Sequence, residues 1–78
     1  MKTVTLALEW RNRIDDDVDL YVARRCWGNV YSVYARMAPM WLAVGRDPIE
    51  FLRENHPTRE AAMAALEAAV MALGVKDA

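Results

Sequence analysis

The amino-terminal residues alternate strictly between large apolar side chains and smaller or polar ones. Val4, Leu6, Leu8 and Trp10 fall on one side of an extended chain, and the residues between them fall on the other. A repeat of two residues is typical of a β-strand with one buried face. The pattern predicts a strand over residues 3–11, and this strand needs a second layer to cover its apolar face.

Two further strands are expected in the first half of the chain. Residues 12–17 are polar and are expected to form a loop, and strand-like runs follow over residues 18–27 and 30–37. The dipeptide Gly28-Asn29 between these runs matches a two-residue hairpin turn of type II′, which places glycine first. Such a turn would fix the pairing register of the two strands.

The second half of the chain carries two helix-start signals. Residues 40–44 predict either a short edge strand or part of a loop. Asp47 at an N-cap predicts a short helix over about 48–55, because proline and glutamate follow at the favourable positions. Thr58 is expected to cap a long helix over 59–73.

These elements predict one domain of the α+β class spanning residues 1–78. It consists of a three- or four-stranded antiparallel β-meander over residues 3–44, followed by the short helix and the long C-terminal helix packed on one sheet face. A chain of 78 residues has room for a single small core.

Composition limits the partners that we expect. Ten basic and eleven acidic residues give a net charge of −1, whereas a general binder of phosphate backbones is usually basic. The single cysteine, Cys26, leaves no internal disulfide and fits a reducing compartment. No apolar run reaches the roughly 20 residues of a membrane span, and no signal peptide is recognised. We expect a cytoplasmic protein with no membrane partner.

Residues that could support catalysis or bind a metal are sparse. The only histidine, His56, has no nucleophile at a diagnostic spacing, and the chain has no glycine-rich phosphate loop. Asp15, Asp17 and Asp19 have the spacing that begins a calcium loop, but Leu20 stands where that loop requires glycine. We therefore expect no enzyme activity, no metal and no cofactor.

An acidic segment is a first candidate for partner binding. It concentrates four carboxylates in five residues: Asp15, Asp16, Asp17 and Asp19. One interpretation is a loop that imitates phosphate and docks on an arginine-rich partner. The other is a solvated hairpin loop.

The second sheet face is the other candidate. The register of a turn at residues 28–29 groups aromatic and arginine side chains there, namely Tyr21, Arg25, Trp27, Tyr34 and Arg36. These residue types dominate the binding energy of protein interfaces. Two alternatives remain: residues 38–57 fold back over this face, or the side chains pair across strands on a solvated sheet.

Three resemblances bear on function. The helix opening Thr58-Arg59-Glu60-Ala61-Ala62 resembles the second helix of double-stranded-RNA-binding domains. Three strands plus a helix resemble DNA-binding domains such as integrase arm-binding modules, which read the major groove with the open sheet face, a role that Arg25, Trp27 and Arg36 would suit. Taken as a whole, the aromatic-rich strands, the glycine turn and the Thr-x-Glu-Ala-Ala helix resemble small phage-encoded accessory proteins, among which anti-CRISPR proteins are the best-known class.

The last resemblance implies a stoichiometric inhibitor of a bacterial defence complex. We expect a non-catalytic binding protein that occupies a protein surface of a CRISPR-Cas-like nucleoprotein complex in the host bacterial cytoplasm, without contacting nucleic acid directly. Two alternatives remain: a sheet-face nucleic-acid-binding module, and a homodimeric structural or accessory protein.

Overall fold

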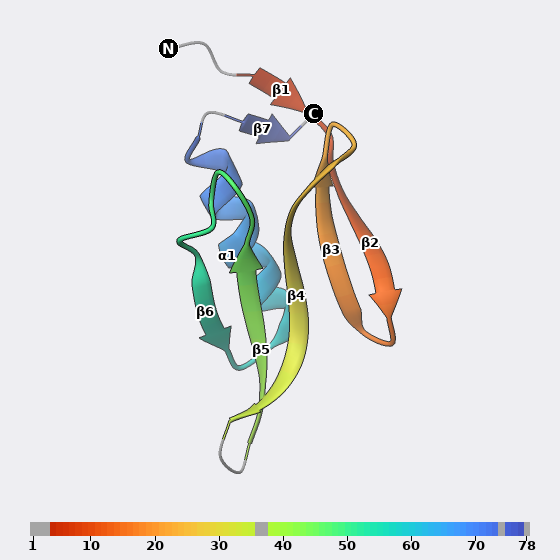
Figure 1. Cartoon of the computed structure of the whole chain (residues 1–78), viewed down its shortest axis with the longest axis vertical. Helices are drawn as coiled ribbons and strands as arrows, with labels where there is room; N and C mark the ends of the chain where they lie inside the picture. Colours follow the sequence, from red (N-terminus) through yellow and green to blue (C-terminus); the bar gives the residue numbers. More distant parts are fainter. Residues whose placement is uncertain (1–3, 36–37, 74, 78) are drawn as a thin grey trace.

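The computed structural model describes residues 4–35, 38–73 and 75–77 (Figure 1). The described elements are β1 (Val4–Leu6), β2 (Leu8–Ile14), β3 (Asp17–Val22), β4 (Arg25–Ala35), β5 (Ala38–Gly45), β6 (Arg53–His56), α1 (Arg59–Met71) and β7 (Val75–Asp77). Strands β2 to β6 form an antiparallel sheet in the order of the sequence, while β1 and β7 pair in parallel. The α+β class and the antiparallel meander are confirmed, but among the described residues the main sheet has five strands in place of three or four, and there is one helix in place of two.

The strand predicted over residues 3–11 is divided in two. Its first part is β1, and its second part is β2, which continues to Ile14 before the chain turns at Asp15 and Asp16. The predicted loop over residues 12–17 is therefore much shorter in the structure. Leu8 and Trp10 pack against the core as the alternation predicts, and Trp10 Nε1 donates a hydrogen bond to Glu67 Oε2 at 2.7 Å.

The hairpin turn predicted at Gly28-Asn29 is wrong. β4 runs through both residues, and the chain instead reverses at Ala23 and Arg24, whose φ angles are 52° and 68°. Gly28 is needed for packing: a Cβ atom there would lie 2.7 Å from the Leu66 side chain of α1. Glycine thus permits a close approach of the helix to the sheet, which produces the same sequence signal as a turn.

Because the turn lies at residues 23–24, the strand register differs from the predicted one. Leu20 lies opposite Gly28 and Tyr21 lies opposite Cys26, so a bulge gives Trp27 no partner of its own on β3. Such bulges change which residues share a face of the sheet. The register predicted from a turn at residues 28–29 is accordingly wrong.

The short helix predicted over residues 48–55 is also wrong. Its first half is a turn, and its second half is β6, which pairs with β5. Ile49 is fully buried and Leu52 is 6% exposed, so the turn is attached to the core by two apolar side chains. The backbone N–H of Gly45 donates to the carbonyl of Leu52 at 3.0 Å and closes the turn.

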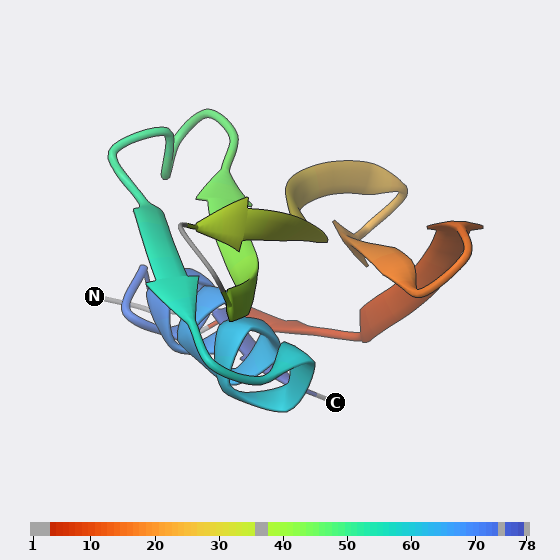
Figure 2. The same ribbon diagram turned by 90° about the horizontal axis from the view of Figure 1, so that it is seen from below.

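The long helix begins as predicted and its described part ends two residues earlier than expected. Thr58 is the N-cap, and its hydroxyl accepts a hydrogen bond from Ala61 N at 3.1 Å. Ala62, Leu66 and Val70 are fully buried at a spacing of four residues, which places one face of α1 against the sheet. Figure 2 shows α1 on one side of the main sheet. No helix in the described residues is long and apolar enough to cross a membrane.

Candidate binding surface

The sheet face opposite α1 carries three of the predicted binding residues, Asp17, Asp19 and Tyr21. β5 and β6 extend the sheet sideways beyond β4. Among the described elements no helix or strand covers this face (Figure 2). The alternative in which residues 38–57 fold over it is therefore wrong. We call this surface the open face; two of its residues, Asn29 and Leu42, are nearly buried. By strand register it carries Glu9, Arg11, Arg13, Asp17, Asp19, Tyr21, Asn29, Tyr31, Leu42, Val44 and Arg53.

Arg11 and Tyr21 form a cation–π pair on the open face. The guanidinium carbon of Arg11 lies 4.1 Å from the centre of the Tyr21 ring, and Arg11 Nη2 donates to Glu9 Oε2 at 2.9 Å. This hydrogen bond and the charge of Arg11 lower the pKa of Glu9, and the same hydrogen bond raises the pKa of Arg11. The pair stays ionised, and Tyr21 is held in one orientation by a neighbour on the adjacent strand.

A chain of polar contacts crosses the open face from β2 to the end of β5. Asp19 Oδ1 lies 3.3 Å from Arg13 Nε and accepts a hydrogen bond from Asn29 Nδ2 at 2.6 Å. Asn29 Oδ1 accepts a further bond from Arg46 Nε at 3.3 Å, and Asn29 is only 8% exposed. These bonds satisfy a polar group that β4 buries in mid-strand, so they hold the sheet together.

The four predicted acidic residues have different surroundings. Asp15 and Asp16 are exposed in the β2–β3 turn, whereas Asp17 and Asp19 belong to β3. Asp17 Oδ1 accepts a hydrogen bond from the backbone N–H of Ser32 at 3.3 Å, and the Asp19 side chain is 14% exposed. Asp15 and Asp16 are thus the pair that can meet a partner without breaking a contact of the sheet.

Arg25 and Trp27 lie together where β4 begins. Arg25 lies 5.5 Å from the centre of the Trp27 ring and bonds both the carbonyl and the carboxylate of Asp47, the latter at 3.3 Å. Trp27 is half-buried and packs against the core cluster, so its side chain contributes to the stability of the fold. Tyr34 of β4 lies opposite Pro39 of β5, and only its strand position is described. Arg36 lies outside the described residues.

Phe51 is the exposed aromatic residue that the sequence did not reveal. It is 76% exposed in the turn between β5 and β6, which we call the Phe51 turn (residues 46–52). Arg46 N donates to the Trp27 carbonyl at 2.9 Å, and Leu52 N donates to the Ile49 carbonyl at 3.0 Å. These bonds hold the turn in one shape. Because a helix was predicted here, no signal distinguished Phe51 from a core residue.

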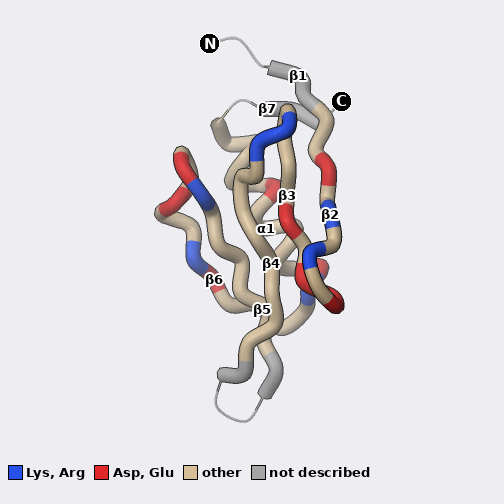
Figure 3. Tube along the Cα trace, turned by 45° about the vertical axis from the view of Figure 1, so that its right-hand side comes forward, with Lys and Arg blue, Asp and Glu red and all other residues tan. Residues whose placement is uncertain are grey.

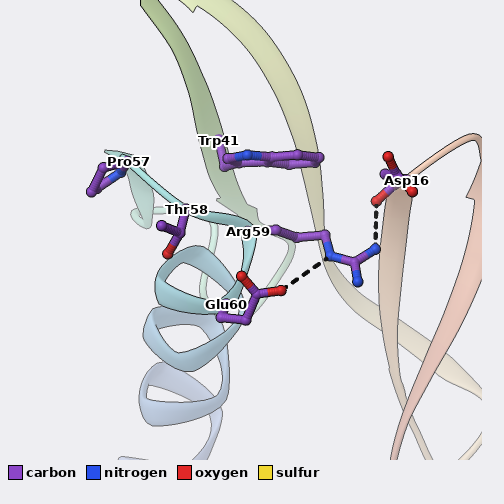
Figure 4. A pocket seen from close by; sticks show the side chains of 6 residues that line it. All are labelled: Asp16, Trp41, Pro57, Thr58, Arg59 and Glu60. Atoms are coloured by element: carbon purple, nitrogen blue, oxygen red, sulfur yellow. Dashed lines mark hydrogen bonds and ion pairs between the residues drawn. The ribbon is translucent and has the colours of Figure 1, made fainter.

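An open groove lies between the start of α1 and the β2–β3 turn (Figure 4). Its volume is about 370 Å³, and its lining residues are Asp16, Trp41, Pro57, Thr58, Arg59 and Glu60. Arg59 Nη1 donates to the backbone carbonyl of Asp16 at 3.2 Å, and its Nε lies 3.7 Å from Glu60 Oε2. Arg59 therefore ties α1 to the β2–β3 turn, which makes the groove part of the scaffold that positions the acidic turn.

The single histidine and the single cysteine each lie close to another polar group. Among the described residues, no three His, Cys, Asp or Glu residues lie close enough to hold a metal ion. His56 Nε2 lies 3.1 Å from Glu54 Oε1, and Cys26 Sγ lies 3.4 Å from the Gly28 carbonyl. Each therefore has a partner within its own strand.

Comparisons of the chain with protein families, with curated proteins and with solved structures found no match.

Proposed function

We propose that this chain is a non-catalytic binding protein that inhibits a bacterial defence complex of the CRISPR-Cas-like kind by occupying a protein surface of that complex. The observation that carries the proposal is an uncovered sheet face on which an arginine and a tyrosine, Arg11 and Tyr21, are already held in contact. Arginine and tyrosine are frequent interface anchors, and a contact held before binding loses little side-chain freedom on association.

The mixture of charges on the open face favours a protein partner over nucleic acid. β2 carries one glutamate and two arginines, and the neighbouring strand β3 carries two aspartates, as the blue and red segments of these strands show (Figure 3). Glu9 lies beside Arg11, and Asp19 lies beside Arg13, so a phosphate backbone would meet a negative charge next to each arginine. A protein surface with charges of both signs can match such a pattern.

The acidic turn supports a target that itself binds nucleic acid. Asp15 and Asp16 are exposed at one end of the sheet, and they place two negative charges on a tight turn. Proteins that bind DNA or RNA present arginine and lysine to phosphate groups. The turn would therefore be attracted to the positively charged surface of a nucleoprotein complex.

The test is whether the chain blocks immunity in living bacteria. We would express it in strains that carry different CRISPR-Cas systems and measure the plating efficiency of a targeted phage. The proposal expects restored plating in at least one strain. The double variant Arg11→Ala/Tyr21→Ala should lose this effect, whereas the control Glu50→Ala, an exposed change in the Phe51 turn, should keep it. We choose Tyr21 because Trp27 also packs against the core.

The same experiment has a biochemical counterpart that separates protein binding from nucleic-acid binding. The purified chain should form a complex with the affected defence proteins and should leave free duplex DNA and RNA unbound at physiological salt. Affinity for free nucleic acid that falls steeply with salt would instead identify a sheet-face nucleic-acid-binding module. Unrestored plating in every strain, without a complex, would refute the proposal.

A further inference from the structure

Among the described strands, β2 is the longer of the two edge strands of the main sheet, and residues 9–12 form the part of its outer edge that concerns us. The strand order leaves β2 and β6 without an outer neighbour among the described strands (Figure 1). β6 has four residues, and Pro57, which has no N–H, follows it. β2 pairs regularly with β3 from Leu8 to Asn12, and a bulge interrupts the pairing only beyond Asn12. The backbone of an edge strand is a template for pairing with another strand.

Symmetry restricts how two copies of β2 can pair. Two copies of β2 that pair antiparallel are related by a two-fold axis normal to the sheet. Directly opposed side chains lie on the same face, so the residue next to the axis must lie opposite its own copy. The central candidates are Glu9, Trp10 and Arg11. An axis at Glu9 would oppose two glutamates, and an axis at Arg11 would oppose two arginines. Only the axis at Trp10 places Glu9 of each copy opposite Arg11 of the other.

The side chains around this axis suit the pairing. Glu9 and Arg11 are 57% and 47% exposed and lie on the open face, where their own ion pair measures 2.9 Å. Two such pairs brought together would alternate in sign across the junction. On the other face, the half-buried Trp10 is held by its hydrogen bond to Glu67, and it would meet Trp10 of the second copy. Aromatic and oppositely charged cross-strand pairs both stabilise a sheet.

We propose that a second copy of this chain binds antiparallel along the outer edge of β2, in the register that places Glu9 opposite Arg11. The two five-stranded sheets then become one continuous sheet, and the Arg11–Tyr21 pairs of both copies lie near each other on the open face. This inference does not depend on the proposed function. The dimer would have two equivalent open faces, one from each copy.

Analytical ultracentrifugation across about two decades of concentration tests the pairing, because mass action favours the dimer at high concentration. The wild-type chain should approach twice its mass of 8.9 kDa. Arg11→Glu opposes two acidic residues and should weaken association about tenfold or more. The exchange Glu9→Arg/Arg11→Glu should restore it, and Glu50→Arg, which reverses an exposed charge in the Phe51 turn, should leave it unchanged. Circular dichroism checks that each variant folds.

Disulfide trapping tests the register itself. In a Cys26→Ser background, Glu9→Cys mixed with Arg11→Cys should crosslink much faster than either variant alone, because directly opposed residues have Cα atoms at a distance that a disulfide can span. The proposal is overturned if the wild-type chain stays monomeric throughout, if Arg11→Glu does not weaken the dimer, if the charge exchange fails to restore it, or if the mixed cysteines crosslink no faster than the single ones.

Discussion

At the scale of single residues, Gly28 shows how closely α1 approaches the sheet. A Cβ atom at this position would lie 2.7 Å from the Leu66 side chain and 2.6 Å from the Val44 carbonyl oxygen. Both distances are shorter than van der Waals contact, and the Val44 oxygen belongs to the backbone of a central strand. The helix can therefore lie at its observed position only while residue 28 has no side chain.

Gly28→Ala should consequently destabilise the fold by about 1–3 kcal/mol, the usual cost of overpacking a core. Urea unfolding measures this change. The double variant Gly28→Ala/Leu66→Ala should lose less stability than the sum of the two single variants, because the shorter side chain removes one of the two clashes. Unchanged stability of Gly28→Ala would show that the helix can move away from the sheet at little cost.

The ion pair of Glu9 and Arg11 makes a prediction about pH. Arg11 lowers the pKa of Glu9 through a hydrogen bond first and through its charge second. A carboxyl whose pKa is lower in the folded state than in the unfolded state stabilises the fold above the unfolded pKa, and this stabilisation is lost as the pH falls through the folded pKa. In an NMR titration, Arg11→Ala should raise the Glu9 pKa, whereas Arg13→Ala should leave it nearly unchanged. An unaltered Glu9 pKa in Arg11→Ala would contradict the observed pair.

At the scale of elements, the sequence revealed regular repeats and local capping signals, but it did not reveal the contacts between elements. The alternation around Leu8 and Trp10 and the cap at Thr58 predicted a strand and a helix, because both signals are local. The reversal at Ala23 and Arg24 has no glycine or asparagine to mark it. The sequence around Gly28 does not tell a turn from a close approach of α1, and only the contact with α1 explains this glycine. The strand pairings that place the side chains of the open face depend on that reversal.

The Phe51 turn was misread for a related reason. Its proline and acidic residues resemble a helix start, but Ile49 and Leu52 both reach the core, and residues 53–56 pair with β5. Burial of two apolar side chains and a ladder of backbone hydrogen bonds outweighed the local helix signals. Such tertiary effects commonly override propensity.

This arrangement predicts that truncation of two nearby apolar residues, Ile49 and Phe51, changes the stability of the fold by very different amounts. Ile49→Ala should destabilise the fold by about 2–5 kcal/mol, because Ile49 is fully buried. Phe51→Ala should change stability by less than about 0.5 kcal/mol, because Phe51 is 76% exposed. Urea unfolding of both variants measures the difference. A large loss of stability in Phe51→Ala would mean that the ring serves the fold and is not free to contact a partner.

At the scale of the whole molecule, the meander separates charges along the length of the sheet. β3 connects the turn with Asp15 and Asp16 at one end to the turn with Arg24 at the other, and Arg25 follows directly (Figure 3). The net charge is only −1, yet the two turns that flank β3 differ in sign. Such a separation of charge contributes to the dipole moment of the molecule, which can orient it during a diffusional encounter.

The last prediction follows from this separation and concerns the rate of association with a defence complex. If Asp15 and Asp16 approach a positively charged surface, Asp15→Asn/Asp16→Asn should slow association and reduce its dependence on salt, while dissociation changes little. The fold should persist, because exposed charges contribute little stability. The matched control is Glu50→Gln, which removes an exposed carboxylate from the Phe51 turn. Stopped-flow mixing at several salt concentrations measures the rates. Equal association rates for the double variant and the wild-type chain would assign the acidic turn to solvent alone, because at physiological salt the field of two exposed charges acts over only about 8 Å.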